Sequence, residues 1–329
     1  MNKTKRVEYI DLFRGFGILL MIMGHVGFGS RFDHFIHAFH MPMFFFVSGL
    51  FFRREDASVK DVAVRKARSL LLPYVVFGAF HEVVYSVMQG GIATSELRHL
   101  LWENTSGLPI AGALWFLTAL YFVDLVYYLL DRYINSMKML SFIVALIALF
   151  GNTINLFCPF RLPWAMDAAF VGLGLYHIAR LLINSPDKWE KKLFHLPLTS
   201  ALLLGGATFL IFLNGYINMR TGTYAIIPLF WVNAVLATLT GLNLSRHMDD
   251  RIGRKGNALL RCVKTMGRNS ITFLCLNQLV ILLWKNFFAQ MPPMNGFVKS
   301  LAILVLTVIV LMGLDCVIQR TKLRVVIGK

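Results

Sequence analysis

The chain has 329 residues, of which 57% are hydrophobic and only 15% are charged, and its mean hydropathy is +0.63. Soluble domains carry about 25% charged residues, so this composition excludes a soluble protein with a single anchor and indicates many membrane spans. The net charge of +16 does not require nucleic acid as a partner, because Lys and Arg accumulate in the cytoplasmic loops of membrane proteins. The four cysteines lack any CxxC or pairing pattern, so we expect neither a disulfide framework nor a metal site.

Apolar runs long enough to cross a bilayer predict an all-α, polytopic helical bundle formed by one domain over residues 1–329. Ten such runs lie at 10–29, 36–52, 69–90, 114–130, 139–158, 163–183, 198–215, 224–242, 270–290 and 297–317. Ten spans put both termini on the same side, which we assign to the cytoplasm. The cytoplasmic segments then hold 25 of the 33 Lys and Arg residues and the outer loops hold four, as the positive-inside rule predicts.

The first run contains two ionisable residues, Arg14 and His25. Eleven positions turn a helix by three turns plus about 20°, so both side chains leave the same face, roughly 16 Å apart along the axis. Ionisable residues inside a span are costly and indicate a functional site, although Arg14 alone could also snorkel to the nearer interface. Arg14, near the cytoplasmic face, is suited to hold a phosphate, and His25, beyond the midplane, is suited to act as a general base.

Other polar residues in the first three runs have two interpretations each. Asp11 either pairs with the arginine of its own run or acts directly. Pro42 is expected to kink or open the second run, and His40 beside it either lines a site or forms a hydrogen bond at a helix interface. Glu82, in the third run, is a candidate to orient His25 through the second ring nitrogen, or it is a buried interface residue.

Two cytoplasmic segments, 53–68 and 243–269, are rich in basic residues. Either segment is suited to bind anionic lipid head groups or a phosphorylated cofactor, and the alternative is that both only enforce topology. On the outer side, His34 and His37 are expected to be solvated. Together with His40 they have no carboxylate or cysteine set nearby except Asp33, so we expect no metal centre.

Four segments stand out in order along the chain. They are Tyr9–Gly15 with His25, Phe39–Gly49, Arg65–Tyr74 and Leu114–Leu117. Together they resemble the acyltransferase family 3 membrane proteins, which O-acylate sugars of cell-surface glycans. The Arg-x10-His pair is a weak motif alone, but the His-Met-Pro-x-Phe-Phe-Phe-x-Ser-Gly sequence at 40–49 makes the resemblance specific. The stretch Leu162–Asp167 is most similar to the sugar O-acetylase branch, which includes fucose 4-O-acetylase-like proteins.

The resemblance covers the whole chain, since these enzymes also have about ten helices. It implies that acetyl-CoA binds from the cytoplasm and that the acetyl group passes to a sugar hydroxyl at the outer side. His25 matches the essential histidine of the family and Arg14 matches its partner arginine. Arg65 and Arg68 match basic residues near the CoA phosphates, and Trp115 matches the aromatic residue at the start of the fourth span.

For the acceptor, Trp164 is a candidate stacking platform and Asp167 a candidate hydrogen-bond partner of sugar hydroxyls, because both lie near the outer surface at the start of the sixth run. One departure from the family affects this assignment. The family often shows a histidine in the ninth span after Gly-x-x-Ser, whereas here Gly267–Ser270 leads to Asn277 and Gln278. The role of that histidine is either absent or carried out by an amide, for which we select Asn277.

The residues and this resemblance together predict a multi-pass membrane acyltransferase, and the resemblance implies an O-acetyltransferase of the bacterial inner (plasma) membrane. It acts on a cell-surface or lipid-linked glycan, in contact with membrane lipids and without nucleic acid. No serine or cysteine stands in a nucleophile context, so the acceptor hydroxyl attacks the thioester directly, with His25 as base and Arg14 or a nearby donor stabilising the oxyanion. An acyl-His25 intermediate remains an alternative. The rival class is a transporter or flippase of a glycan or lipid-linked precursor, which the lack of a detectable inverted repeat disfavours.

Overall fold

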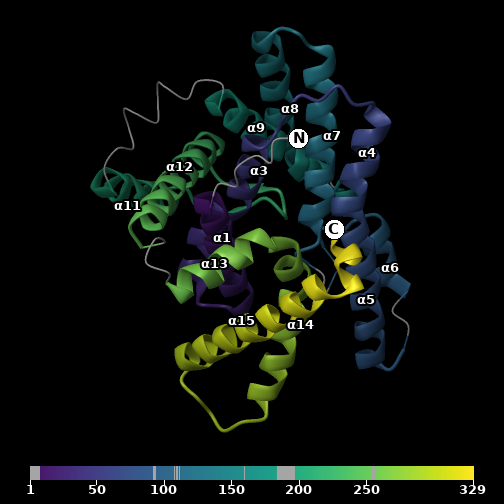
Figure 1. Ribbon diagram of the computed structural model, residues 1–329, viewed down its shortest axis with the longest axis vertical. Helices are drawn as coiled ribbons and strands as arrows, with labels where there is room; N and C mark the ends of the chain where they lie inside the picture. Colours follow the sequence, from purple (N-terminus) through teal and green to yellow (C-terminus); the bar gives the residue numbers. More distant parts are fainter. Residues whose placement is uncertain are drawn as a thin grey trace.

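The computed structural model describes residues 8–91, 94–106, 108, 110, 112–158, 160–183, 197–252 and 257–329. Within these ranges the chain is almost entirely helical (Figure 1), which confirms the all-α prediction. The helices are α1 (Glu8–Val26), α2 (Ser30–His37), α3 (His40–Leu50), α4 (Val59–Lys66), α5 (Leu72–Gln89), α6 (Thr94–Leu101), α7 (Trp115–Tyr133), α8 (Met137–Phe157), α9 (Met166–Ile183), α11 (Pro197–Leu213), α12 (Ile227–Ile252), α13 (Ala258–Arg268), α14 (Ser270–Ala289) and α15 (Gly296–Arg320). An antiparallel hairpin of β1 (Ile217–Asn218) and β2 (Thr223–Tyr224) connects α11 to α12.

Seven helical segments of the described chain are long and apolar enough to cross a membrane, consistent with a polytopic membrane protein. They are α1, 59–89, α8, 163–183, α12 up to residue 251, α14 and α15. The other three predicted runs are also helical, but their helices are too short or too charged to count among these seven segments. α3 has 11 residues and α11 has 17, and α7 carries Asp124, Asp131 and Arg132 within its 19 residues.

The second predicted run is interrupted at a corner between two helices. α2 ends at His37 and α3 begins at His40, so the break lies before Pro42 and not at it. Pro42 occupies the first turn of α3, where its missing N–H leaves no helical hydrogen bond unmade. The corner brings the rings of His37 and His40 together, with centroids 5.1 Å apart.

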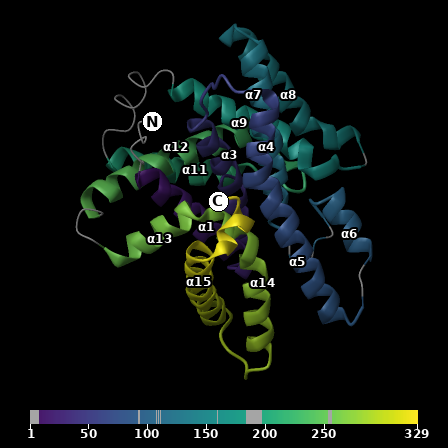
Figure 2. The ribbon, with the colours of Figure 1, turned by 45° about the vertical axis from the view of Figure 1, so that its right-hand side comes forward.

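The first helix, α1, lies at the centre of the bundle, where it packs against α3, α12, α13 and α14 (Figure 2). Its crossing with α13 is close because each helix presents a glycine to the backbone of the other. A Cβ on Gly15 would overlap the carbonyl oxygen of Val263, and a Cβ on Gly267 would overlap that of Asp11. Small residues let the backbones of membrane helices approach in this way, and the contact fixes the rotation of α1.

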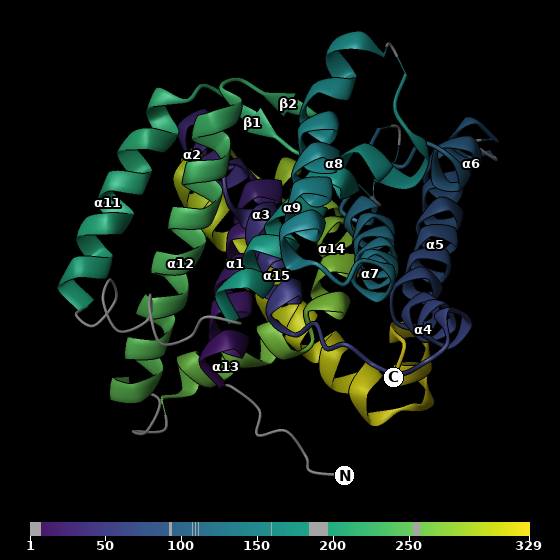
Figure 3. The ribbon, with the colours of Figure 1, turned by 90° about the horizontal axis from the view of Figure 1, so that it is seen from above.

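Figure 3 separates the two ends of the bundle. The basic helices α4 and α13 and the C-terminal turn Lys322–Ile327 lie at one end, and α2 and the β1–β2 hairpin lie at the other. This grouping is the one expected if the basic segments face the cytoplasm. The predicted cytoplasmic residues within 1–7, 184–196 and 253–256 lie outside the described ranges.

Candidate active site

The helix α1 carries Arg14 and His25 to two separate hollows. Arg14 lines a pocket of about 270 Å³, which we call the inner pocket. His25 lines a cavity of about 70 Å³, which we call the outer cavity. The inner pocket includes residues of the basic helix α4, and the outer cavity includes residues of the β1–β2 hairpin. One helix therefore joins sites at opposite ends of the bundle.

The inner pocket has an excess of positive charge. Its charged lining residues are Arg14, Arg53, Arg65, Lys66, Glu55 and Asp124. Lys66 Nζ is 2.8 Å from the buried carboxylate of Asp124, and Arg65 pairs with Glu55 at 2.7 Å on the exposed rim. Arg14 donates a hydrogen bond to Ser270 Oγ at 2.8 Å. Four cationic and two anionic groups favour an anionic ligand at this pocket.

Two of the four predicted donor-binding residues, Arg14 and Arg65, lie together in the inner pocket. Arg68 is exposed and does not line it, and the carbonyl of Arg68 packs against Gly328 of the C-terminal turn. Three residues along a helix leave two side chains about 60° apart around the axis, so Arg65 and Arg68 face different neighbours. Trp115 lies in the outer cavity with His25 and not in the inner pocket.

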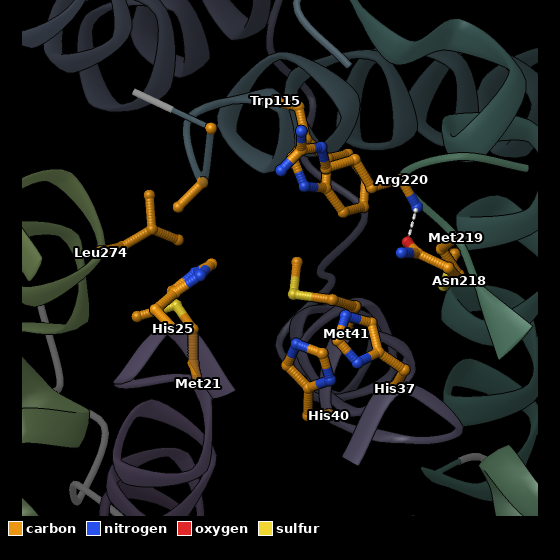
Figure 4. Close-up of a pocket in the computed structure, with 12 residues that line it drawn as sticks. Met21, His25, His37, His40, Met41, Trp115, Asn218, Met219, Arg220 and Leu274 are labelled. Carbon is orange, nitrogen blue, oxygen red and sulfur yellow. Dashed lines mark hydrogen bonds between the residues drawn. The ribbon is translucent and has the colours of Figure 1, made fainter. Parts of the chain in front are cut away.

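The outer cavity is built from α1, the α2–α3 corner, the start of α7, the hairpin and α14 (Figure 4). Its polar lining residues are His25, His37, His40, Asn218 and Arg220. Its apolar wall includes Trp115, Met21, Met41, Met219 and Leu274. An apolar wall with a few convergent polar groups is the usual lining of a small-molecule binding site, and this cavity has that lining.

Two histidines of the α2–α3 corner accompany His25. His40, a predicted site residue, places Nδ1 2.7 Å from the carbonyl oxygen of Ile36. Because a carbonyl only accepts, Nδ1 of His40 carries a proton and the lone pair of the neutral ring is on Nε2. His37 lines the same cavity, whereas the sequence predicts a solvated residue. Its Nδ1 contacts both the carbonyl and the carboxylate of Asp33, at 2.9 and 3.2 Å.

The ring of His25 is held by Gln278 of α14. Gln278 Oε1 accepts a hydrogen bond from the backbone N–H of Ala113 at 3.1 Å, and its Nε2 is 3.2 Å from His25 Nδ1. Since a backbone N–H can only donate, the amide orientation is fixed and its NH2 group donates to Nδ1. Neutral His25 therefore carries its proton on Nε2 and its lone pair on Nδ1.

Two predicted site residues lie outside the lining of the outer cavity. Asn277 is fully buried, and its side-chain NH2 donates to the carbonyls of Phe273 and Leu274 in its own helix. Glu82 is buried on α5 away from that lining. The orienting contact to the His25 ring comes from Gln278 instead, because α14 packs directly against α1.

The two predicted acceptor residues, Trp164 and Asp167, also lie outside the lining of the outer cavity. Asp167 is 1% exposed and forms an ion pair with Arg161 at 2.6 Å. Trp164 has a left-handed backbone with φ 52°. Its backbone N–H donates to Trp102 and its indole N–H to Leu101. These contacts hold the segment after α8 against the end of α6.

Four polar residues of the site escape sequence reasoning: His37, Asn218, Arg220 and Gln278. His37 precedes His40 by three positions, a spacing that predicts a shared face within one helix, although in the structure the two rings meet across the α2–α3 corner. Arg220 is one of only four basic residues in the predicted outer loops, where charge of this sign is rare. Gln278 directly follows Asn277, the amide residue selected from the sequence. Within the described ranges, no group of three or more His, Cys, Asp or Glu side chains is arranged to hold a metal ion.

A comparison with protein families gives one match. The model of a family described as an acyltransferase domain matches residues 7–315, which include every lining residue of the inner pocket and the outer cavity. No curated protein and no solved structure matches the chain significantly.

Proposed function

The chain belongs to acyltransferase family 3, and from this premise we propose that it transfers an acetyl group from cytoplasmic acetyl-CoA to a sugar hydroxyl of a cell-surface or lipid-linked glycan. It is a multi-pass membrane protein, and the proposal places it in the inner (plasma) membrane of a bacterium. The observation that carries the proposal is the pair of hollows joined by α1. A wide basic pocket contains Arg14, and a small, partly apolar cavity contains His25.

The charges of the inner pocket support CoA as the donor. CoA carries its phosphates at one end and its thioester at the end of a long, uncharged pantetheine arm. Arginine binds phosphate through paired N–H donors, and Arg14, Arg65 and Lys66 supply cationic donors here. The phosphates stay at the cytoplasmic surface while the arm follows α1 for roughly 16 Å to His25. An uncharged arm costs far less in this interior than a phosphate would.

The outer cavity supports the chemical step. The acceptor hydroxyl replaces the Gln278 amide at the lone pair of His25 Nδ1, and it transfers its proton there as its oxygen attacks the thioester carbonyl carbon. The C–S bond then breaks, the electron pair leaves on sulfur, and the CoA thiolate takes the proton back from His25. The apolar wall, with Met21 and Trp115, keeps bulk water from hydrolysing the thioester.

The test is mass spectrometry of surface and lipid-linked glycans from cells that carry the native protein, His25→Ala or His34→Ala. His34 is a matched control because it lies on α2 and contacts the carbonyl of Ile211 outside the outer cavity. We expect His25→Ala to remove the mass of one acetyl group from a glycan, with transfer reduced at least ~100-fold. His34→Ala should leave that mass in place, with both variants present in the membrane at the native level.

Each alternative has its own outcome in this experiment. Retention of the acetyl mass in His25→Ala would remove His25 as the general base. Loss of a different acyl mass would keep the mechanism and change the donor. A change in the amount or location of the glycan, with acylation unchanged, would support the transporter alternative.

A further inference from the structure

The β1–β2 hairpin and the preceding loop hold Arg220 in one orientation. The backbone N–H of Arg220 donates to Asn218 Oδ1 at 3.0 Å within the turn between the strands, as drawn in Figure 4. The side-chain Nε donates to the carbonyl of Thr105 at 2.7 Å. Nε is thereby occupied. Among the residues that the structure describes, the two terminal nitrogens of the guanidinium form no hydrogen bond, so they can donate to other acceptors.

The guanidinium of Arg220 lies close to the side-chain amide of Gln278, which contacts His25. A Cβ placed on Gly112 would lie 2.9 Å from Arg220 Nη1 and 3.4 Å from both amide atoms of Gln278. The same Gln278 amide contacts His25 Nδ1. Arg220, Gln278 and His25 therefore cluster around Gly112, where a side chain would meet the guanidinium. In Figure 4 the Arg220 side chain runs from the hairpin toward the side of the cavity formed by α1 and α14.

The outer cavity presents a fixed positive charge. Its lining in the described part of the chain contains Arg220 and three histidines but no carboxylate. Lys285 Nζ lies at the edge and donates to the carbonyl of His25 at 3.0 Å. Arg161 offers a comparison, because Asp167 neutralises it at 2.6 Å. Among the residues that the structure describes, no carboxylate forms an ion pair of this kind with Arg220.

We propose that Arg220 is the catalytic residue that binds the oxyanion of the tetrahedral intermediate. This inference rests on the proposed acyl transfer. Attack of the acceptor oxygen forms a C–O bond and moves the carbonyl π pair onto the thioester oxygen, where the Arg220 Nη groups donate to it. The acceptor proton goes to His25. When the carbonyl reforms, the C–S bond breaks and the thiolate recovers the proton. Arg14 is excluded from this role because it lies roughly 16 Å away along α1.

The test measures incorporation of labelled acetyl-CoA into glycan by membrane vesicles that contain the native protein, Arg220→Gln, Arg220→Lys or Arg31→Gln. Arg31 is an exposed arginine of α2 outside the outer cavity and serves as the control. Loss of one oxyanion donor lowers kcat by about 100- to 1000-fold. We expect that loss in Arg220→Gln with an unchanged KM for acetyl-CoA, a smaller loss in Arg220→Lys, and partial recovery of Arg220→Gln in added guanidinium chloride. A merely structural arginine would lower the amount of folded protein in the membrane and would not lower kcat alone.

A second experiment distinguishes two possible ligands of Arg220, the oxyanion of the intermediate and an anionic group on the glycan acceptor. The purified protein is incubated with acetyl-CoA and excess glycerol as an uncharged acceptor, and release of the CoA thiol is measured. Parallel losses in glycerol-dependent thiol release and glycan transfer support the proposal. Native kcat in Arg220→Gln, or a loss confined to glycan transfer, overturns it. Failure of the underlying function is a distinct result, because the native protein would then incorporate no more label than His25→Ala.

Discussion

The amide of Gln278 decides which ring nitrogen of His25 is basic, because Ala113 N–H fixes its other end. A carboxylate in its place would accept and not donate, and would draw the imidazole proton to Nδ1. We expect Gln278→Glu to lower kcat for acetyl transfer about 100-fold without changing the KM for acetyl-CoA. Labelled acetyl-CoA in membrane vesicles provides the measurement. Gln290→Glu, at the exposed end of the same α-helical segment, is the control. A raised KM with native kcat would contradict this role.

Asn277 and Gln278 also show a limit of prediction from sequence, because the sequence does not reveal which of the two amides contacts His25. Adjacent residues on a helix point about 100° apart. Gln278 consequently reaches His25, while Asn277 turns its amide to the carbonyls of α14. The two side chains have the same functional group, so residue type does not distinguish them. Only the rotation of α14 against α1 does, and that depends on packing between segments more than 250 positions apart.

At the scale of elements, the crossing of α1 and α13 depends on the absence of a side chain at Gly15 and Gly267. Alanine at either position would overlap a backbone carbonyl, which cannot move aside as a flexible side chain can. Overpacking of this kind costs about 1–3 kcal/mol. We expect Gly15→Ala and Gly267→Ala to lower the thermal unfolding midpoint of the detergent-solubilised protein by several degrees.

A glycine of another helix supplies the control for this prediction. Gly205 lies within α11, and a Cβ there would meet no heavy atom within 4 Å. Alanine also has a better helix propensity than glycine by about 1 kcal/mol. Gly205→Ala should therefore leave the unfolding midpoint unchanged or raise it. Equal effects at Gly15 and Gly205 would show that the α1–α13 contact is not limiting for stability.

The existence of the elements could be predicted because membrane insertion depends on local hydropathy. Each of the ten apolar runs corresponds to a helix, although three of those helices are too short or too polar to meet the spanning standard. Pro42 predicts an irregularity in the second run, but hydropathy does not show that the break falls before the proline, at the α2–α3 corner. The ion pair between Asp167 and Arg161 could not be predicted from hydropathy either, because it depends on how the intervening residues fold.

At the scale of the whole molecule, the grouping of α4, α13 and the C-terminal turn at one end carries a prediction about topology. A reporter fused after Lys329 should face the cytoplasm because basic segments resist translocation. A cysteine introduced by Thr221→Cys, in the exposed hairpin turn, should react with an impermeant maleimide from the outside once the native cysteines have been replaced. An outward-facing reporter, or labelling of position 221 only after lysis, would contradict the ten-span topology.

The continuity of α1 restricts where this chain can gain or lose residues. α1 is one uninterrupted helix from Glu8 to Val26, and it carries Arg14 and His25 to different hollows. One residue inserted between them would rotate His25 by about 100° and advance it by about 1.5 Å. A loop can accommodate an inserted residue by a local change of conformation, whereas in a helix the insertion rotates and shifts every residue that follows it. The number of residues between Arg14 and His25 is therefore fixed by the positions of the inner pocket and the outer cavity.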